Sequence, residues 1–351
     1  MTSASPRLPV VDMLRGFAAL AVCWYHFTNG SANFLPEGLL KSSGTHGWLG
    51  VEVFFVISGF IIPYALQRSG YRMADYGRFI LRRIIRLDPP YLASIVILLV
   101  LGYVCSALPG FRGPPFEPTF VQVVLHLGYL NALAGQPWLN PAFWTLAIEL
   151  QYYLLVGLLF PVLAHRAAGV RVAAFAVLAC LAVLLPAEQH LFHWLFLFML
   201  GMAAFQLRVG LLGRSGFWLG VLLLGGGAWL VNGGLIAATA AATALLLGLS
   251  GPKEHPIFLF LGQISYSLYL LHIPVGSRVV NFSQKFDLSM PGRLAALLAA
   301  VAVSIGAAWL LYRCVELPAQ RWSSSLRYRE RGTQKNDAPA TAADSPGTAA
   351  L

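Results

Sequence analysis

Long apolar runs separated by short polar connections repeat along most of the chain. A helix needs about 20 mostly apolar residues to cross the hydrocarbon layer of a bilayer, and many of these runs have about that length. We therefore predict an all-α fold, a polytopic integral membrane helical bundle with about ten transmembrane helices. The predicted spans are residues 9–28, 48–67, 90–107, 143–163, 170–185, 190–207, 215–230, 234–250, 256–275 and 292–313.

Three segments need a separate interpretation. The stretch 119–133 is apolar but short, which is typical of a re-entrant segment or an interfacial helix. Arg7 precedes an apolar stretch, as in a signal peptide, but Asp12 and Arg15 interrupt that stretch, so we expect a retained first helix. After Trp322 the residues are polar and small and cannot bury enough apolar area to fold. We divide the chain into a transmembrane domain, residues 1–322, and a disordered cytoplasmic tail, residues 323–351.

Composition agrees with a membrane protein and gives no sign of a nucleic-acid partner. The chain is 58% hydrophobic and 11% charged, with a net charge of +10 and a mean hydropathy of +0.68. Much of the Lys and Arg lies in short connections beside apolar runs, where such residues orient helices in the lipid bilayer. The cysteines lack metal-type spacing, so we interpret them as small buried hydrophobes and expect no metal. They are Cys23, Cys105, Cys180 and Cys314.

The same basic residues predict the orientation. If the N-terminus is cytoplasmic, five of the 24 Lys and Arg residues fall on the external side and the remaining 19 on the cytoplasmic side. This bias follows the positive-inside rule. We therefore expect both termini in the cytoplasm and an even number of spans. The five external residues are Lys41, Arg112, Arg278, Lys285 and Arg293.

The first predicted span contains ionisable side chains, which are costly inside a membrane and need a partner, an aqueous cavity or a function. Arg15 and His26 are eleven residues apart, about three helical turns, so both lie on one face and roughly 16 Å apart along the axis. The alternative is an interfacial pair of Arg15 with Asp12, and a His26 that merely reaches the outer surface.

Three other predicted spans carry ionisable groups at a similar depth, towards the external half of the bilayer. They are Glu52, Glu149 and His272, with Trp144 on the same span as Glu149. A carboxylate beside an imidazole orients it and stabilises its cationic form, which a general base needs. We expect a polar pocket on this side.

A cluster of arginines is predicted at the opposite, cytoplasmic surface. Arg82, Arg83 and Arg86 lie in RRIIRLDPPYL, and the last two are about one turn apart. Guanidinium groups bind phosphates through two parallel hydrogen bonds, so this cluster suits a phosphorylated donor. The alternative is that these arginines only anchor the helix end.

Other polar residues give weaker signals. Ser58 lies in VISGF, which lacks the first glycine of a nucleophile elbow and follows no strand, so a serine hydrolase is disfavoured. Nothing in the sequence pairs the histidines as haem ligands, and we interpret His126 and His193 as packed or interfacial. Glu316 is expected to pair with a neighbouring arginine rather than to take part in chemistry.

Taken together, the motifs resemble the acyltransferase-3 family of bacterial membrane proteins. The matching pieces follow the family's order from residue 10 to about 318: Arg15-Gly16 with His26, GVEVFFVISGF, RRIIRLDPPYL, NPAFWTLAIELQYY and SYSLYLLHIP. The resemblance implies ten helices in the bacterial inner (cytoplasmic) membrane and transfer of an acyl group, usually acetyl, from cytoplasmic acyl-CoA. Family acceptors are usually hydroxyls of carbohydrates such as lipopolysaccharide, exopolysaccharide or periplasmic glucan, and sometimes macrolides.

The resemblance also implies roles for individual residues. His26 matches the essential histidine of the first helix and Arg15 its partner arginine, while Glu149 matches the glutamate of Trp-Thr-Leu-x-x-Glu. Arg83 and Arg86 match an Arg-x-x-Arg motif linked to acyl-CoA. Glu52 is a departure, because the family more often has aspartate there. Some members carry a periplasmic hydrolase-like domain, and we expect this chain to handle its acceptor with the membrane domain alone.

We therefore predict a membrane O-acyltransferase (O-acetyltransferase) with His26 as general base. The expected catalytic residues are His26, Glu149 and Arg15, the expected acyl-CoA ligands are Arg82, Arg83 and Arg86, and the expected acceptor-pocket residues are Glu52, Ser58, Trp144 and His272. A secondary transporter that uses His and Glu as a proton relay is the first rival. A non-catalytic export or scaffold subunit is the second, although it leaves the polar pocket unexplained.

Overall fold

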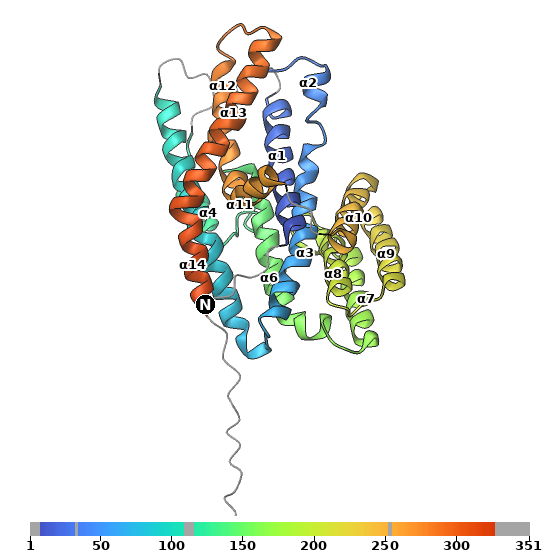
Figure 1. The fold of residues 1–351 in the computed structure, drawn as a ribbon. Helices are drawn as coiled ribbons and strands as arrows, with labels where there is room; N and C mark the ends of the chain where they lie inside the picture. The colour runs from blue at the N-terminus through green and yellow to red at the C-terminus, as the bar shows by residue number, and fades with distance from the viewer. Residues whose placement is uncertain (1–7, 32–33, 109–115, 252–254, 327–351) are drawn as a thin grey trace, which may run out of the picture.

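The computed structural model describes residues 8–31, 34–108, 116–251 and 255–326, and these residues form helices and no strands (Figure 1). Eight helices in this part of the chain are long and apolar enough to cross a membrane. They contain α1 (Pro9–Asn29), α3 (Gly50–Arg68), α4 (Tyr76–Ala107), α6 (Trp144–Leu163), α8 (Leu191–Arg208), α9 (Arg214–Asn232), α11 (Pro256–Leu271) and α13 (Met290–Leu311). The predicted all-α polytopic membrane fold is confirmed.

Two further apolar helices, α7 (Ala168–Leu184) and α10 (Gly234–Leu249), lie where spans were predicted but are shorter, at 17 and 16 residues. One predicted boundary was wrong. The third span was expected to begin at residue 90, but α4 begins at Tyr76 and continues through Pro89 and Pro90. The arginines of its first turns are polar enough to end an apolar run, yet arginine is a good helix former and does not end the helix.

Close backbone contacts at glycines bring the central helices together. An added Cβ at Gly16 of α1 would lie 2.6 Å from the carbonyl oxygen of Phe258 in α11, and one at Gly201 of α8 would lie 2.0 Å from that of Val56 in α3. Without a side chain at these positions, α1 packs directly on α11 and α3 on α8. Among the spans, α8 is the most deeply buried, with α7, α9 and α10 grouped around it (Figure 1).

Prolines inside helical segments free backbone carbonyls, because proline lacks the N–H that would bond the carbonyl four residues earlier. Such a carbonyl needs another donor within a membrane. For the carbonyls freed by Pro63, Pro161 and Pro274, a side chain from a different segment supplies it. The Tyr71 hydroxyl donates to Gly157 O at 2.7 Å, Asn140 Nδ2 to Leu270 O at 3.3 Å, and the Tyr152 hydroxyl to Gly59 O at 3.5 Å.

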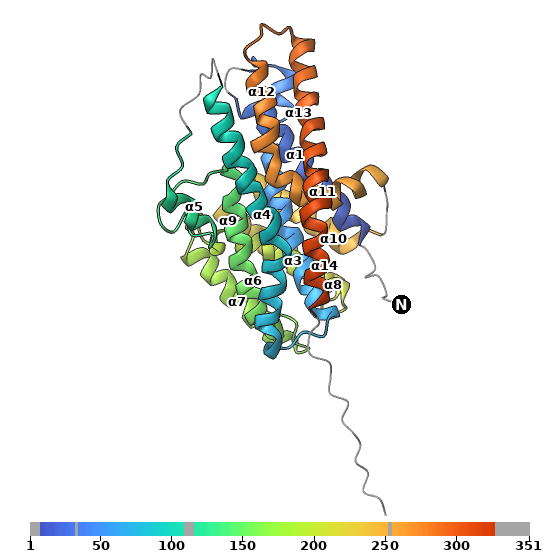
Figure 2. The ribbon, with the colours of Figure 1, turned by 90° about the vertical axis from the view of Figure 1, so that its left-hand side faces the viewer.

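The short apolar stretch after α4 forms α5 (Phe120–His126) and a series of turns rather than a span. Helix α5 lies against the side of the bundle, near α4 and α6 (Figure 2). His126 is buried, with Nδ1 2.6 Å from Gln122 O and Nε2 accepting from Leu139 N at 3.2 Å. Its ring therefore links α5 to the backbone at Leu139, which agrees with a packing role.

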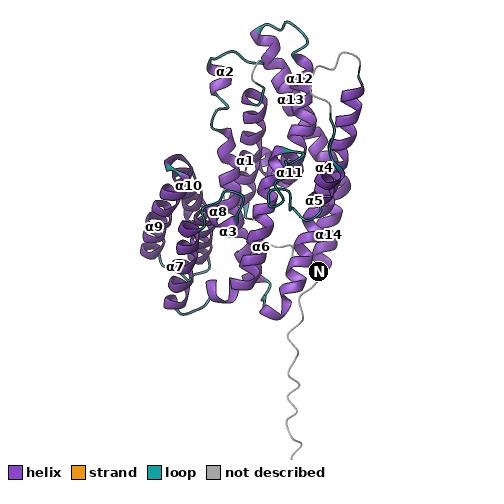
Figure 3. Cartoon of the chain, turned by 180° about the vertical axis from the view of Figure 1, so that it is seen from behind, coloured by secondary structure: helices purple, strands orange, loops and turns teal. Residues whose placement is uncertain are grey.

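Several connections that were expected on one side of the membrane lie at one end of the bundle. The α3–α4 and α6–α7 connections lie there with the end of α14 (Leu317–Ser325), while α2 (Leu39–Ser42) and the connection from α12 (Ser277–Ser283) to α13 lie at the other end (Figures 1 and 3). Helix α14 continues past the expected domain end at Trp322, and residues 327–351 of the expected tail lie outside the described residues.

The interpretation of the cysteines as buried hydrophobes holds only for Cys23. Cys105 is partly exposed, and Cys180 and Cys314 are exposed. These three lie at the periphery of the bundle, where many large apolar side chains are exposed as well. In a membrane protein this outer surface faces lipid, so an apolar residue needs no protein neighbour there.

Candidate active site

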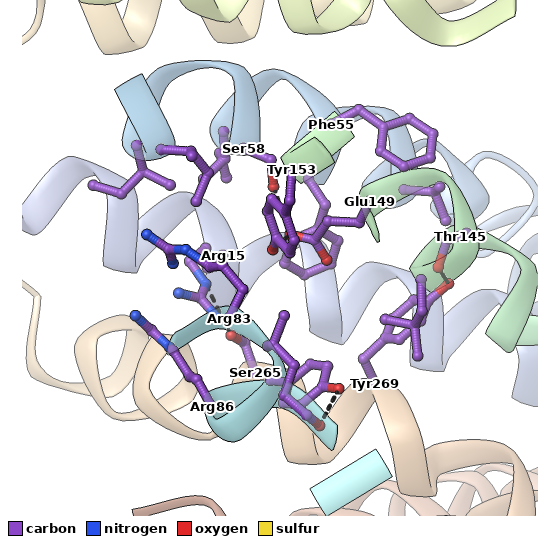
Figure 4. A pocket seen from close by; sticks show the side chains of 18 of the residues that line it. Arg15, Phe55, Ser58, Arg83, Arg86, Thr145, Glu149, Tyr153, Ser265 and Tyr269 are labelled. Carbon is purple, nitrogen blue, oxygen red and sulfur yellow. Dashed lines mark hydrogen bonds between the residues drawn. The ribbon is translucent and has the colours of Figure 1, made fainter. Parts of the chain in front are cut away.

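A cavity with about 990 Å³ of empty space, part of it open to solvent, lies between α1, α3, α4, α6, α11 and the C-terminal helices. Its lining combines apolar side chains with a set of polar groups. The arginines gather at one end, Glu149 lies in the middle, and Thr145 and Tyr269 lie at the other end (Figure 4). Residues as far apart in the sequence as Arg15 and Glu316 thus contribute to one site.

Three guanidinium groups form the arginine end of the cavity: Arg15, Arg83 and Arg86. Arg15 Nε donates to Ser265 Oγ at 3.2 Å. The Arg83 guanidinium lies 5.4 Å from the ring centre of Phe79 and 5.6 Å from that of Tyr153. Contacts with aromatic faces hold this group while leaving its edge free for hydrogen bonds. The arginine end can therefore bind an anion with two acceptor oxygens.

Arg82 was expected in the same set, but it does not line the cavity. Successive helical residues are rotated by about 100°, so Arg82 and Arg83 lie on opposite flanks of Arg86, and the cavity is on the flank of Arg83. The backbone at Arg82 instead meets α14, where Ser323 Oγ donates to its carbonyl oxygen at 2.7 Å.

Glu316 also lines the arginine end, although it was not expected to belong to the site. It is the last residue of a π-helical turn, η5 (Tyr312–Glu316), and is buried. Its carboxylate accepts hydrogen bonds from Ser267 Oγ at 2.6 Å and from Gln320 Nε2 at 2.9 Å. It lies within electrostatic range of Arg15 and Arg86, so it partly balances their charge.

Glu149 occupies the middle of the cavity rather than a place beside His26. Ser58 Oγ donates to Glu149 Oε1 at 2.9 Å, and the Tyr153 hydroxyl, one helical turn away, donates to the same oxygen. A carboxylate has about four acceptor positions, so Glu149 keeps capacity for a further donor. Ser58, expected in an acceptor pocket, is therefore part of the same cavity as the arginines.

Tyr269 marks the far end of the cavity and connects it to a pair of imidazoles. Its hydroxyl lies 2.9 Å from Thr145 Oγ1 and donates to Ala142 O at 3.0 Å. Its ring centre lies 5.7 Å from that of His272, which in turn lies 5.1 Å from that of His26. His26 and His272 are thus brought together just beyond the cavity, by α1 and the end of α11.

Two polar atoms near this end have no hydrogen-bond partner among the described residues: His272 Nε2 and Glu52 Oε2. Both side chains are buried, and Glu52 lies within electrostatic range of the Tyr269 hydroxyl. An unpaired buried polar atom is destabilising, and it often marks a place where a ligand or water binds. Glu52, His26 and His272 do not line the cavity themselves, and we call this group, which lies beyond Tyr269, the imidazole end.

Trp144, also expected in the acceptor pocket, does not line the cavity. Its ring packs on Trp194 at 5.2 Å and on Phe55 at 6.1 Å between ring centres. Phe55 does line the cavity, so Trp144 supports the wall from behind.

Sequence reasoning missed Tyr153, Ser265 and Tyr269, which line the cavity. Part of the signal was present. Tyr153 is four residues after Glu149, and Ser265 and Tyr269 are four residues apart in SYSLY, so each pair shares a helical face. The sequence shows which polar residues share a helical face. Which of these faces lies against the arginines depends on how the helices pack.

Comparisons with known proteins identify the family of the chain. A family described as an acyltransferase domain, acyltransferase-3, matches residues 8–313. O-acetyltransferase OatA of Staphylococcus aureus (strain NCTC 8325 / PS 47) is 33% identical over 172 residues, which cover 46% of this chain and 26% of OatA. Acyltransferase MdmB of Streptomyces mycarofaciens is 27% identical over 369 residues, covering 90% of this chain and 92% of MdmB. No solved structure matches. The chain belongs to the acyltransferase-3 family.

Proposed function

We propose that the chain is a membrane O-acyltransferase that transfers an acyl group, in the first place acetyl, from cytoplasmic acyl-CoA to a hydroxyl of a carbohydrate-type acceptor. One observation carries this proposal. A single cavity has three guanidinium groups at one end, and a pair of imidazoles lies just beyond its other end. The first end suits the phosphates of a CoA donor, and the second suits removal of a hydroxyl proton.

The donor would bind with its phosphates at Arg83, Arg86 and Arg15, and its pantetheine arm would follow the cavity past Glu149. The free acceptor positions of the Glu149 carboxylate suit the amide N–H groups of that arm. The thioester would then lie near Tyr269, close to the imidazole end. Tyr269 and His272 are buried, and exclusion of water from this end would protect a thioester from hydrolysis.

The reaction itself needs one proton acceptor. The acceptor oxygen attacks the thioester carbonyl carbon, and its proton passes to the bare ring nitrogen of His26. The bond between carbon and sulfur breaks, CoA leaves as a thiolate, and the proton on His26 neutralises that thiolate. The products are an ester and free CoA, and His26 returns to its neutral form.

The names of the relatives support an acyltransferase, since they include an O-acetyltransferase and an acyltransferase. The match covers only 26% of the length of OatA. The activity and the acceptor proposed for this chain therefore need their own test.

Mass spectrometry of envelope glycans tests the function. Cells with the protein should carry glycans with acetyl-sized mass increments that disappear in cells without it, and a His26→Ala variant should not restore them. A transporter would instead move a donor or acceptor into proteoliposomes without forming any acylated product. That result would remove the enzyme assignment.

The proposal also requires the arginine end to face the cytoplasm, in the bacterial inner membrane. The charge bias of 19 to five supports this orientation. Reporter fusions after residues 70 and 325 should report cytoplasm, and fusions near residues 40 and 280 should report the exterior. An external location of residue 70 would place the arginines away from the acyl-CoA pool and contradict the proposal.

A further inference from the structure

His272 has one ring nitrogen whose protonation is set by its surroundings. Its Nδ1 lies 2.7 Å from Tyr269 O and 3.2 Å from Leu268 O. Carbonyl oxygens only accept hydrogen bonds, so Nδ1 must carry a proton. Its side chain is fully buried, where an imidazolium is unfavourable, so at rest the ring is neutral. Nε2 of His272 is therefore a bare lone pair that can accept a hydrogen bond but cannot donate one.

The local fold holds the ring in this state. His272 begins a π-helical turn, η4 (His272–Gly276), which contains Pro274. Proline removes the hydrogen bond to Leu270 O, which Asn140 Nδ2 replaces from a distant segment. The backbone around His272 is thereby fixed from outside its own helix, and its side chain keeps the two carbonyl contacts.

Among the described residues, the ring nearest to that of His272 is the ring of His26. The two ring centres lie 5.1 Å apart, and their planes are inclined by 48°. An N–H···N hydrogen bond spans about 3 Å, and the two ring radii make up most of the remaining separation. Nε2 has no partner among the described residues, and His26 is only partly buried. A rotation of the His26 ring would therefore bring one of its N–H groups to an acceptor that has no partner among the described residues.

We propose that His272 is a positioning residue for the base: its Nε2 accepts an N–H hydrogen bond from His26 in the working complex. This inference rests on the proposed function. The bond fixes His26 in one tautomer, so the second nitrogen of His26 is bare and directed to the acceptor hydroxyl. When that nitrogen takes the hydroxyl proton, the His26 imidazolium forms beside a fixed acceptor, and it is neutralised when the proton passes to the CoA thiolate.

Two amide substitutions separate this role from a structural one. In His272→Gln, the amide lies near the former Nε2, so its oxygen can accept from His26, but the Nδ1 contact with the carbonyls is lost. In His272→Asn, the amide lies near the former Nδ1, so it keeps the carbonyl contact and loses the acceptor. His272→Ala removes both. His193→Ala is the matched control, because His193 also has Nδ1 at 2.9 Å from a carbonyl oxygen, that of Pro186, but does not line the cavity.

The assay uses membrane vesicles that contain the protein, radiolabelled acetyl-CoA as donor, and the label recovered in the glycan fraction. His272→Ala should lower kcat about 10²-fold, as expected for a misplaced base, with an unchanged KM for acetyl-CoA. His272→Gln should recover about tenfold of that loss, whereas His272→Asn should behave like His272→Ala. His193→Ala should match the wild type.

The opposite order of transfer activities among the His272 variants would overturn the inference. If His272→Asn transfers more label than His272→Gln, or if His272→Ala keeps near-normal kcat, His272 serves only its own turn. If the wild-type protein transports a solute and transfers no acetyl group, the proposed function itself is wrong. The two failures are therefore distinct, and the Gln to Asn comparison remains decisive even if His272→Ala does not fold.

Discussion

The two ends of the cavity are built in opposite ways. At the arginine end, guanidinium groups outnumber carboxylates, and the nearby Glu316 is already bonded to Ser267 and Gln320. At the imidazole end, His272 and Glu52 are buried, and each has a polar atom without a partner among the described residues. The first end has charge in excess and needs an anion. The second is buried and has acceptors without partners among the described residues, which suits proton transfer.

This difference predicts that substitutions can separate donor binding from proton transfer. Glu149 lies between the two ends and is held by Ser58 and Tyr153. Variants at the arginine end should change donor affinity, variants at the imidazole end should change turnover, and variants in the middle should have a small effect on both.

The largest effect is expected at His26. General-base catalysis supplies about 10²–10⁴-fold in rate, so His26→Ala and His26→Gln should lower kcat by that factor. Binding of acetyl-CoA should be retained because His26 does not line the arginine end. The measurement is transfer of radiolabelled acetyl groups under saturating donor. Near-normal transfer by either variant would show that another group takes the proton.

An intermediate effect is expected for the arginines of α4. Losing a charge-assisted hydrogen bond costs about 1.5–3 kcal/mol, roughly tenfold to a hundredfold in affinity. Arg83→Ala and Arg86→Ala should raise the KM for acetyl-CoA by such a factor and leave kcat at saturation largely intact. Arg86→Lys should rescue only partly, because an ammonium keeps the charge without the two parallel bonds.

Arg78→Ala is the control for this pair. Arg78 lies on the same helix and is exposed, but it does not line the cavity. Its KM should equal that of the wild type. An equal rise in KM for Arg78→Ala would mean that the α4 arginines act through the charge of the helix end and not through the site.

The smallest effect is expected at Ser58, which supplies one of the two hydrogen bonds to Glu149. Ser58→Ala should cost about 1 kcal/mol, or roughly fivefold in kcat/KM, since the Tyr153 bond remains. Ser69→Ala is a suitable control, because that serine caps the end of the same helix and its hydroxyl donates to the helix backbone at Leu66 O. A loss as large as that of His26→Ala would assign Ser58 to the chemistry itself.

Much of this comparison could be predicted from the sequence. Hydrophobicity is a local property, so the spans were found within a few residues apart from the start of α4. The helical period alone placed Arg83 and Arg86 on one face. Arg15 and His26 were expected on one face at different depths, and the structure has Arg15 in the cavity and His26 beyond its far end.

The contacts between helices could not be predicted in this way. Glu149 was expected near an imidazole, but the packing of α3 on α6 brings it to Ser58 instead. Glu316 enters the site through a π-helical turn, which has no simple periodic signature in the sequence. His272 was assigned to the acceptor pocket. That its Nε2 is an unprotonated acceptor follows only from the carbonyl oxygens that contact Nδ1 in the folded chain.

Equilibrium binding of acetyl-CoA to the purified protein in lipid nanodiscs tests the separation of the two ends most directly. The account predicts that His26→Ala binds within about twofold of the wild type, whereas the Arg83→Ala/Arg86→Ala double variant binds at least about tenfold more weakly. Wild-type affinity in the double variant, or an equal loss of affinity in His26→Ala, would contradict the division of the cavity into a donor-binding end and a proton-accepting end.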